Sequence, residues 1–192
     1  MSVTLQNIYE TRDLILRVSS KKLAREAADY FKRNREFLEP FESTLPVEVF
    51  TERGQKLMMG YYANLVKKGV GFRFWISPKS DPRKIIGSIS LNNVVMGSFK
   101  SCFLGYRLDK DYVSRGYMTQ AIRQIVRIAF DDVGLHRIEA NIMPHNIASI
   151  RAAEKAGLVF EGMSKQYLWI HGAWHDHAHY TILNSDPRVN VE

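Results

Sequence analysis

Cysteine, proline and long apolar runs are scarce in this sequence. Of its 192 residues, one is cysteine and six are proline. A lone cysteine cannot form an internal disulfide, so we expect Cys102 to be a buried free thiol in a reducing, cytoplasmic setting. No segment approaches the roughly 18 apolar residues of a membrane span, and the N-terminus lacks the layout of a secretion signal. The sequence therefore predicts a cytoplasmic protein without a membrane partner.

Long blocks of one charge are also missing, although the chain is basic overall. Lysine and arginine number 27 against 20 acidic residues, a net charge of +7. No run of five or more basic residues indicates a nucleic-acid-binding arm. The positive balance favours anionic ligands such as a phosphate-rich cofactor or ribosomal RNA beside a protein substrate, and solubility explains it as well.

The length fits one domain, residues 1–192, with a core at about 11–184. Hydrophobic periodicity predicts the element order β-α-α-β-β-β-α-β-α-β-β. Ser19 and Ser20 are favoured residues for capping the first helix, Pro46 for starting the second, and Gly69 for ending it. The expected segments of the first half are a strand at 14–18, helices at 21–34 and 46–68, and strands at 71–76 and 84–95.

The stretch from Cys102 to Gly162 organises the second half. Its expected elements are a strand at 101–108, a helix after Gly116, a strand at 137–142 and a helix at 147–156, and a hairpin at 159–170 and 173–183 follows. Two helix N-termini then lie beside two strand ends, which makes an anion-binding cleft. We interpret it as the site of an acyl-coenzyme A.

The loop before the third helix carries the sequence Ser114-Arg115-Gly116-Tyr117. A glycine after a basic residue at a helix entrance lets backbone N–H groups approach an anion closely. Arg115 could add charge and Thr119 a hydroxyl group. A tight turn with Arg115 in solvent is the alternative interpretation of this spacing.

Short sequence motifs on separate elements resemble those of the GCN5-related N-acetyltransferases, the GNAT superfamily. They are Arg-Gly-Tyr-Met-Thr at 115–119, Asn146 with Ser149, and Ala-Gly-Leu-Val-Phe-Glu-Gly at 156–162. Segments 101–106, 143–146 and 172–177 resemble the RimJ type, the ribosomal-protein-alanine N-acetyltransferases. The resemblance spans about 14–183 and implies the GNAT acyl-CoA N-acyltransferase fold, an α/β (α+β) architecture whose mixed central sheet is flanked by helices.

The resemblance also implies roles in binding acetyl-CoA as co-substrate. Arg107 and Leu108 would pair with the pantetheine arm where two parallel strands splay apart. Asn146 would reach the pantetheine amide, and Ser149 would donate a proton or hydrogen bond to the departing thiolate. The loop that would hold the pyrophosphate consists of Ser114, Arg115, Gly116, Tyr117, Met118 and Thr119.

The implied acceptor is an amine that attacks the thioester directly, without a covalent enzyme intermediate. Some relatives carry a tyrosine that acts as the acid, and the matching position here is Ala153. Some carry a glutamate base, and the matching positions here are Asn141 and Leu168. Ser149 is therefore the acid candidate, and the resemblance assigns no base. Glu42 and Asp176 are possible bases, and Glu139 and Glu161 join Ser149 as catalytic candidates. The expected acceptor-binding residues are Phe37, Leu38, Phe41, Glu42, Tyr167 and Asp176.

Two features of the final hairpin allow alternatives. His175, His177 and His179 share one strand face and could hold zinc, but no fourth ligand is evident, so we expect no metal. The aromatic residues could clamp an acceptor or pack across the hairpin; they are Tyr167, Trp169, Trp174 and Tyr180.

The expected acceptor is the N-terminal α-amine of a protein, such as the alanine of a ribosomal protein. A small amine, meaning a polyamine, an amino acid or a drug, is the first alternative. A ribosome-associated module that binds RNA or protein is the second, motivated by the net charge of +7. We expect a monomer or a homodimer.

Overall fold

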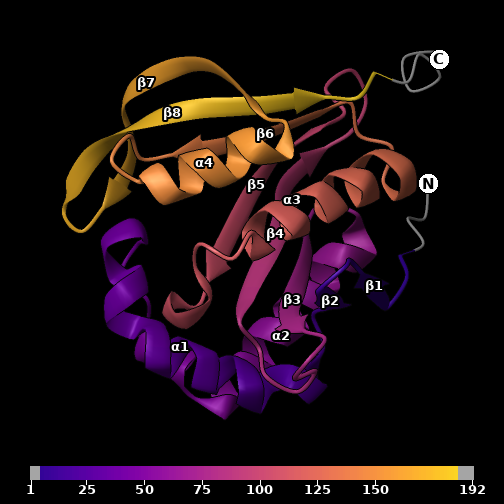
Figure 1. Ribbon diagram of the computed structural model, residues 1–192, viewed down its shortest axis with the longest axis vertical. Helices are drawn as coiled ribbons and strands as arrows, with labels where there is room; N and C mark the ends of the chain where they lie inside the picture. The colour runs from indigo at the N-terminus through magenta and orange to yellow at the C-terminus, as the bar shows by residue number, and fades with distance from the viewer. Residues whose placement is uncertain (1–4, 186–192) are drawn as a thin grey trace.

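One eight-stranded sheet, in the order β1-β2-β3-β4-β5-β6-β8-β7, runs through the computed structural model, which describes residues 5–185 (Figure 1). The ends of the expected domain, 1–4 and 186–192, lie outside the described residues. The strands are β1 (Ile8–Glu10), β2 (Leu14–Val18), β3 (Phe72–Pro78), β4 (Gly87–Val95), β5 (Ser101–Leu108), β6 (Arg137–Ile142), β7 (Val159–Ile170) and β8 (Ala173–Leu183). The helices are α1 (Ala24–Leu38), α2 (Glu52–Lys68), α3 (Tyr117–Arg127) and α4 (Ile147–Ala156).

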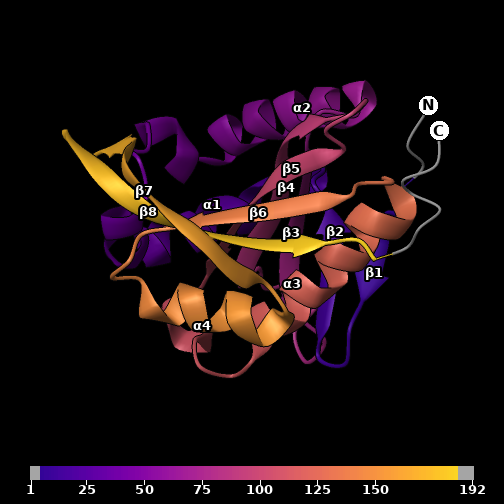
Figure 2. The ribbon, with the colours of Figure 1, turned by 90° about the horizontal axis from the view of Figure 1, so that it is seen from above.

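Each face of the sheet buries its own hydrophobic cluster, because side chains alternate along a strand. Helices α1 and α2 cover one face, and α3 and α4 cover the other (Figure 2). In β3, Phe74 belongs to the cluster beneath α3, whereas its neighbour Trp75 packs with Tyr30 and Phe31 of α1. The expected mixed α/β architecture is therefore confirmed. None of the helices formed by residues 5–185 has the length and apolar character of a membrane-crossing segment.

Strands β5 and β6 form the parallel pair of this otherwise antiparallel sheet, and they soon separate (Figure 1). Their pairing joins Ser101–Phe103 to Arg137–Glu139 and goes no further, although β5 continues to Leu108 and β6 to Ile142. The remaining edges of the two strands face a gap in the middle of the sheet. A cavity can therefore pass from one face of the sheet to the other at this point.

The element order agrees with the prediction apart from β1. This three-residue strand lies at the edge of the sheet, and the hydrophobic periodicity did not indicate it. The capping prediction for the first helix is wrong. Ser20 precedes a short 3-10 turn and makes no side-chain cap, and Ser19 accepts a hydrogen bond of 3.2 Å from Trp75 Nε1. The turn after Pro46 is also 3-10, and α2 begins at Glu52.

Thr51 is the N-cap of α2, and replacing it tests this assignment. Its Oγ1 accepts a hydrogen bond of 3.0 Å from the backbone N–H of Gly54 and donates one to Glu48 O. We expect Thr51→Ala to lower the free energy of unfolding by about 1 kcal/mol, the usual effect of losing a helix cap. Ser20→Ala, which removes no cap bond, should change it by less than about 0.5 kcal/mol. Urea denaturation of the two variants measures both values, and equal losses would contradict the assignment.

Candidate functional site

A cavity of about 670 Å³ occupies the gap between β5 and β6 and extends to both faces of the sheet. We call its two parts the α3 half and the α1 half, after the helix on each side. Leu104, Tyr106, the loop before α3 and the start of α4 line the α3 half. The α1 half is lined by Phe37, Leu38, Phe41, Glu42, Arg73, Ser88, Ser90, Asn92, Arg107, Asn141 and His177.

The loop before α3 has the conformation of an anion-binding turn. Ser114 and Gly116 have φ angles of 60° and 73°, and Gly116 occupies the N-cap of α3. No side chain caps α3, whereas Thr51 and Asn146 cap α2 and α4. The N–H groups of the first turn of α3 therefore have no side-chain acceptor, and nothing lies within 4 Å of a Cβ built on Gly116. These features fit a phosphate group at the helix N-terminus.

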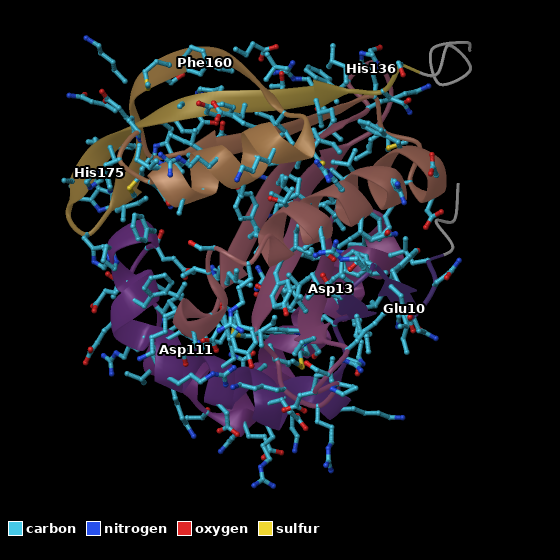
Figure 3. The ribbon with its side chains drawn as sticks, viewed as in Figure 1. Glu10, Asp13, Asp111, His136, Phe160 and His175 are labelled. Carbon is cyan, nitrogen blue, oxygen red and sulfur yellow. The ribbon has the colours of Figure 1, made fainter. Side chains whose placement is uncertain are left out.

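The predicted loop residues do not all face the cavity. Ser114, Gly116, Tyr117, Met118 and Thr119 line it. Arg115 is not part of the lining, because its Nη2 donates a 2.7 Å hydrogen bond back to Asp111 O and its guanidinium lies 5.1 Å from the Tyr112 ring centroid. Asp111 marks this loop in Figure 3. The structure thus gives no support to Arg115 as a phosphate ligand.

Positive charge reaches the α3 half from helix α4 instead. Arg151 and Lys155 line the cavity one helical turn apart. The sequence analysis did not single them out, although their i,i+4 spacing after Asn146 places them on one helix face. Arg107 and Leu108, expected to pair with an extended ligand, lie on the part of β5 whose edge toward β6 is unpaired.

Ser149 forms a hydrogen-bonded pair with Tyr106 across the α3 half. Its Oγ donates to the Tyr106 hydroxyl at 2.8 Å, and that hydroxyl donates to Ser149 O at 3.1 Å. Asn146 fixes the start of the helix by accepting a 3.2 Å bond from Ser149 N. Burial raises the pKa of Tyr106 to about 12, so the phenol stays neutral at pH 7. The sequence analysis placed Tyr106 only within the expected strand at 101–108 and did not select it as a site residue.

Glu42 is the predicted base candidate that the cavity contains. Its Oε1 forms an ion pair with Arg107 Nε. Its Oε2 is buried and has no hydrogen-bond partner, and 10% of the side chain is exposed. A buried carboxylate oxygen without a donor is an incomplete site, and a cationic group in the α1 half would complete it.

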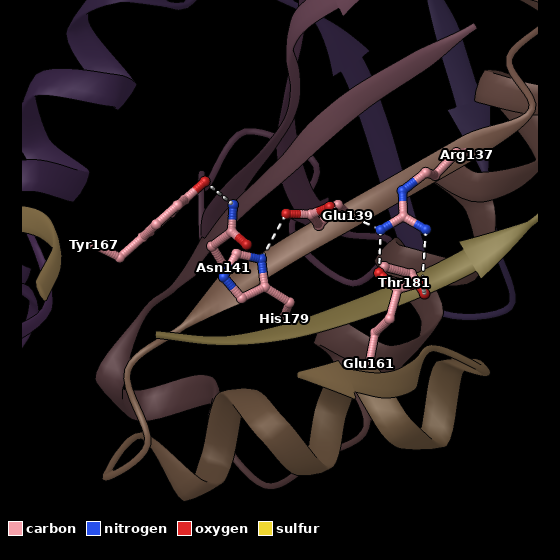
Figure 4. A network of polar contacts seen from close by, with 7 residues as sticks. All are labelled: Arg137, Glu139, Asn141, Glu161, Tyr167, His179 and Thr181. Carbon is pink, nitrogen blue, oxygen red and sulfur yellow. Dashed lines mark hydrogen bonds and ion pairs between the residues drawn. The ribbon is translucent and has the colours of Figure 1, made fainter. Parts of the chain in front are cut away.

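Glu139 and Glu161 are held by Arg137 and do not line the cavity (Figure 4). Arg137 Nη2 lies 2.9 Å from Glu139 Oε2, and its Nη1 donates to Glu161 Oε1 at 2.8 Å. Burial alone would raise the pKa of Glu139, but hydrogen bonds from His179 and Arg137 outweigh it and lower the pKa. Arg137 also lowers the pKa of Glu161. Both carboxylates are therefore weakened as bases, and the geometry does not support either one in catalysis.

His177, which the sequence analysis considered only as one of three possible zinc ligands, is also part of the cavity. Its side chain is 3% exposed and lines the α1 half. Nδ1 lies 3.1 Å from His175 O, and because a carbonyl only accepts, Nδ1 carries the proton and Nε2 keeps its lone pair. Burial is the largest cause that lowers the pKa of His177 below 6.5, so the imidazole is neutral at pH 7.

Tyr167 and Asp176, expected to bind the acceptor, support the wall behind the cavity instead. The Tyr167 ring lies 5.7 Å from His177 and 4.9 Å from His179 between ring centroids, and its hydroxyl accepts a 3.3 Å bond from Asn141 Nδ2. Asp176 Oδ1 accepts a 2.8 Å bond from Gln166 N in the irregular part of β7. Neither residue lines the cavity.

The remaining aromatic residues pack within the hairpin, as one of the two alternatives predicted. Trp169 and Trp174 are cross-strand partners with ring centroids 5.6 Å apart, and Tyr180 packs against Phe160 at 5.6 Å.

In residues 5–185 no group of three or more histidine, cysteine or acidic residues could hold a metal. Cys102 is buried, and burial raises the pKa of its thiol to about 12, so it is a poor nucleophile.

Residues 37–42, which comprise the end of α1 and the 3-10 turn after it, form a wall of the cavity. Phe37, Leu38 and Phe41 line the α1 half. The Phe41 ring stacks on His145, in the loop before α4, with centroids 5.8 Å apart and an interplanar angle of 30°. This contact joins the end of α1 to the loop that carries Asn146.

Comparison with known proteins places this geometry in context. The family described as "Acetyltransferase (GNAT) domain" matches residues 13–159. The chain is 39% identical over 153 residues to the probable N-acetyltransferase YjcK of Bacillus subtilis, covering 80% of this chain and 84% of that one. It is 34% identical over 176 residues to the [ribosomal protein uS5]-alanine N-acetyltransferase of Escherichia coli, covering 92% and 90%. The crystal structure of the ribosomal-protein-S5-alanine acetyltransferase from Vibrio fischeri superposes with a TM-score of 0.88 at 34% identity and covers 93% and 97%.

Proposed function

Because the chain belongs to the GNAT acetyltransferase family, we propose that it moves the acetyl group of acetyl-CoA to the N-terminal α-amine of a protein. Acetyl-CoA-dependent N-acetyltransferase activity follows from the family. The N-terminal alanine of a ribosomal protein is the acceptor for which the relatives from Escherichia coli and Vibrio fischeri are named. An acceptor of this kind would place the enzyme in the cytoplasm.

The unpartnered oxygen of Glu42 carries the proposal for an amine acceptor in the α1 half. An α-amine has a pKa of about 7.7–8.0, so most of it arrives as ammonium at pH 7. Glu42 Oε2 is a buried acceptor for such a group, and Phe37 and Phe41 line the same half of the cavity. Holding the amine beside the gap between β5 and β6 provides the positioning that accelerates a two-substrate reaction.

Acetyl-CoA supplies the activated acetyl group from the opposite face of the sheet. The uncapped N-terminus of α3 and the turn at Gly116 would hold its pyrophosphate, with Arg151 and Lys155 adding positive charge. The free edge of β5 and the side chain of Asn146 would bind its extended arm. The two substrates thus approach the gap from the α3 half and the α1 half.

Two groups of this chain would move the protons of the reaction. The neutral His177 Nε2 accepts a proton from the amine in the α1 half, while Glu42 holds the ammonium. Ser149 Oγ donates its proton to the departing sulfur in the α3 half and can regain one through Tyr106. One N–C bond forms and one C–S bond breaks. The ammonium first gives one proton to His177, which passes it to solvent. After the attack the nitrogen loses a second proton, and this one balances the proton gained by the thiol.

A peptide assay tests the proposed acceptor. We expect the enzyme to acetylate a peptide that begins with alanine and has a free α-amine, because Glu42 and the rest of the α1 half receive that group. Mass spectrometry of the product locates the acetyl group, and release of free thiol gives the rate. The control is the same peptide with a blocked α-amine and an internal lysine. Acetylation of the lysine alone, or of small amines but no peptide, would overturn the proposal.

A further inference from the structure

A cationic side chain that the proposed reaction does not use lines the α1 half. Arg73 belongs to β3, pairs with Ser90 of β4 in the sheet register, and lines the cavity. Its guanidinium carbon lies 4.3 Å from the centroid of the Tyr62 ring of α2. A ring over the flat face of a guanidinium leaves the in-plane N–H donors available for an anion.

The protein leaves one of these donors, Arg73 Nε, unsatisfied. Arg73 Nε is buried and has no hydrogen-bond partner, and no carboxylate in the described part of the chain forms an ion pair with Arg73. Burial, with a smaller contribution from Arg107, lowers the pKa of Arg73 to about 10, so it remains charged at pH 7. A partly buried charge without an ion-pair partner is costly, and a ligand that brings the opposite charge reduces that cost.

Polar groups surround Arg73 on the same face of the sheet. Ser88, Ser90 and Asn92 line the cavity beside it, and Asn92 Nδ2 donates to Ser90 Oγ at 3.1 Å. Gly105 pairs with Ser90 and leaves room for this row, since a Cβ at Gly105 would lie 3.1 Å from Asn92 Nδ2. The wall around Arg73 is therefore polar, unlike the Phe37 and Phe41 side of the cavity.

We propose that Arg73, with Ser88, Ser90 and Asn92, binds a carboxylate that the acceptor carries close to its amine. The inference rests on the proposed function, because it requires the acceptor to occupy the α1 half. In a protein N-terminus this carboxylate is an acidic side chain next to the first residue. In a small acceptor it is the α-carboxylate.

The charges of the α1 half favour such an acceptor over a polycation. Its lining holds two guanidinium groups, Arg73 and Arg107, and one carboxylate, Glu42, while His177 is neutral at pH 7. The half therefore has one positive charge in excess. An acceptor with both an ammonium and a carboxylate gives Glu42 and Arg73 each a partner of opposite charge, whereas a polyamine adds only positive charge. The subsite thus selects against polyamines.

Three peptides that differ at the second residue test this specificity. They begin Ala-Glu, Ala-Gln and Ala-Lys and are otherwise identical, with amidated C-termini. We expect kcat/KM of the wild-type enzyme for the glutamate peptide to exceed that for the glutamine peptide by about tenfold, the gain typical of one charge-assisted pair. The lysine peptide should be the poorest. In Arg73→Gln the preference should fall to about twofold or less, and Arg73→Lys should keep part of it.

Arg17→Gln is the matched control, because Arg17 lies on the neighbouring strand β2 and does not line the cavity. It should keep the full preference. Calorimetry with acetyl-CoA should give the same affinity for all variants, which shows that the α3 half is intact. A folded Arg73→Gln enzyme that keeps the preference, or a wild-type enzyme that acetylates the three peptides equally, would overturn the subsite.

Failure of the proposed function gives a different result. If the wild-type enzyme acetylates no peptide but acetylates free amino acids, the acceptor proposal is wrong, and the subsite is then tested on an amino acid and its amide. A preference for the free acid that Arg73→Gln abolishes would support the carboxylate subsite. Equal rates for acid and amide would overturn it.

Discussion

Ser149→Ala is expected to lower kcat about 100-fold, within the usual range for losing a general acid. Ser149 Oγ is the hydroxyl group that helix α4 presents to the α3 half, where Asn146 caps the helix and Tyr106 accepts the serine proton. Without it, the sulfur departs as an unprotonated thiolate. The affinity for acetyl-CoA should change less than about threefold, because in the proposed complex backbone groups and the basic residues of α4 would hold the phosphates. Stopped-flow or steady-state rates and calorimetry measure the two quantities.

Two further variants separate a catalytic role of Ser149 from a structural one. Ser149→Thr keeps a hydroxyl group at this position and should recover most of the lost rate. Tyr106→Phe removes the partner of that hydroxyl, yet leaves the serine proton in place, and should cost less than about tenfold, well below the loss of a general acid. Parallel losses of kcat and acetyl-CoA affinity in Ser149→Ala would show that the serine only binds.

His177→Gln is expected to lower kcat/KM at pH 7 about 100-fold, again the scale of general base catalysis. Glutamine can still donate to His175 O, so the strand geometry is kept while the lone pair of Nε2 is lost. Amine that binds as ammonium then has no buried base. Only the fraction that is already neutral in solution reacts.

The pH profile distinguishes this role from a packing role. The base acts when neutral, so wild-type activity falls only as the pH drops through the pKa of His177, which burial holds below 6.5. In His177→Gln the acid limb should move up to the pKa of the free amine, about 7.7–8.0. Groups around His177 that also titrate are His175, Asp176 and His179 on its own strand and Tyr167 on β7.

His175→Gln is the control for this experiment. His175 lies two residues away on the same strand face, is labelled in Figure 3, and does not line the cavity. Its side chain bonds Ile170 O, and its carbonyl, which holds His177, is unchanged by the substitution. An acid limb that shifts equally in both variants, or in neither, would contradict His177 as the base.

Glu139 and Glu161, which the sequence analysis offered as catalytic candidates, lie outside the lining of the cavity. Glu161 lies in the family motif at 156–162, and Glu139 lies two residues before Asn141, a position where some relatives carry a glutamate base. The parallel register places Glu139 opposite Phe103, on the last paired position before β5 and β6 separate. Asn141, two residues further along the same face, lines the cavity instead. Two residues along the same face of β6 thus separate a side chain that pairs with Arg137 from one that lines the cavity.

Signals local to the sequence were sufficient to predict most helices and strands and the turn before α3. Strand β5, strand β6, helix α4 and the β7–β8 hairpin begin and end where alternation, helical periodicity and glycine stops predicted them. These signals act between residues a few positions apart, so they can be read along the chain. The same holds for the turn at Gly116, whereas the side-chain cap that Asn146 provides for α4 was found only in the structure.

The tertiary structure alone decided which side chains share the cavity. Glu42, Arg73, Tyr106 and His177 come from the loop after α1 and from three strands. The sequence predicts a place in the site for Glu42, but nothing in it brings Arg73, Tyr106 and His177 to the same cavity. Their convergence depends on two strands separating after three paired residues, which opens both faces of the sheet to one space. That separation is a feature of the pairing between β5 and β6, two strands far apart in the sequence, so it cannot be read from neighbouring residues.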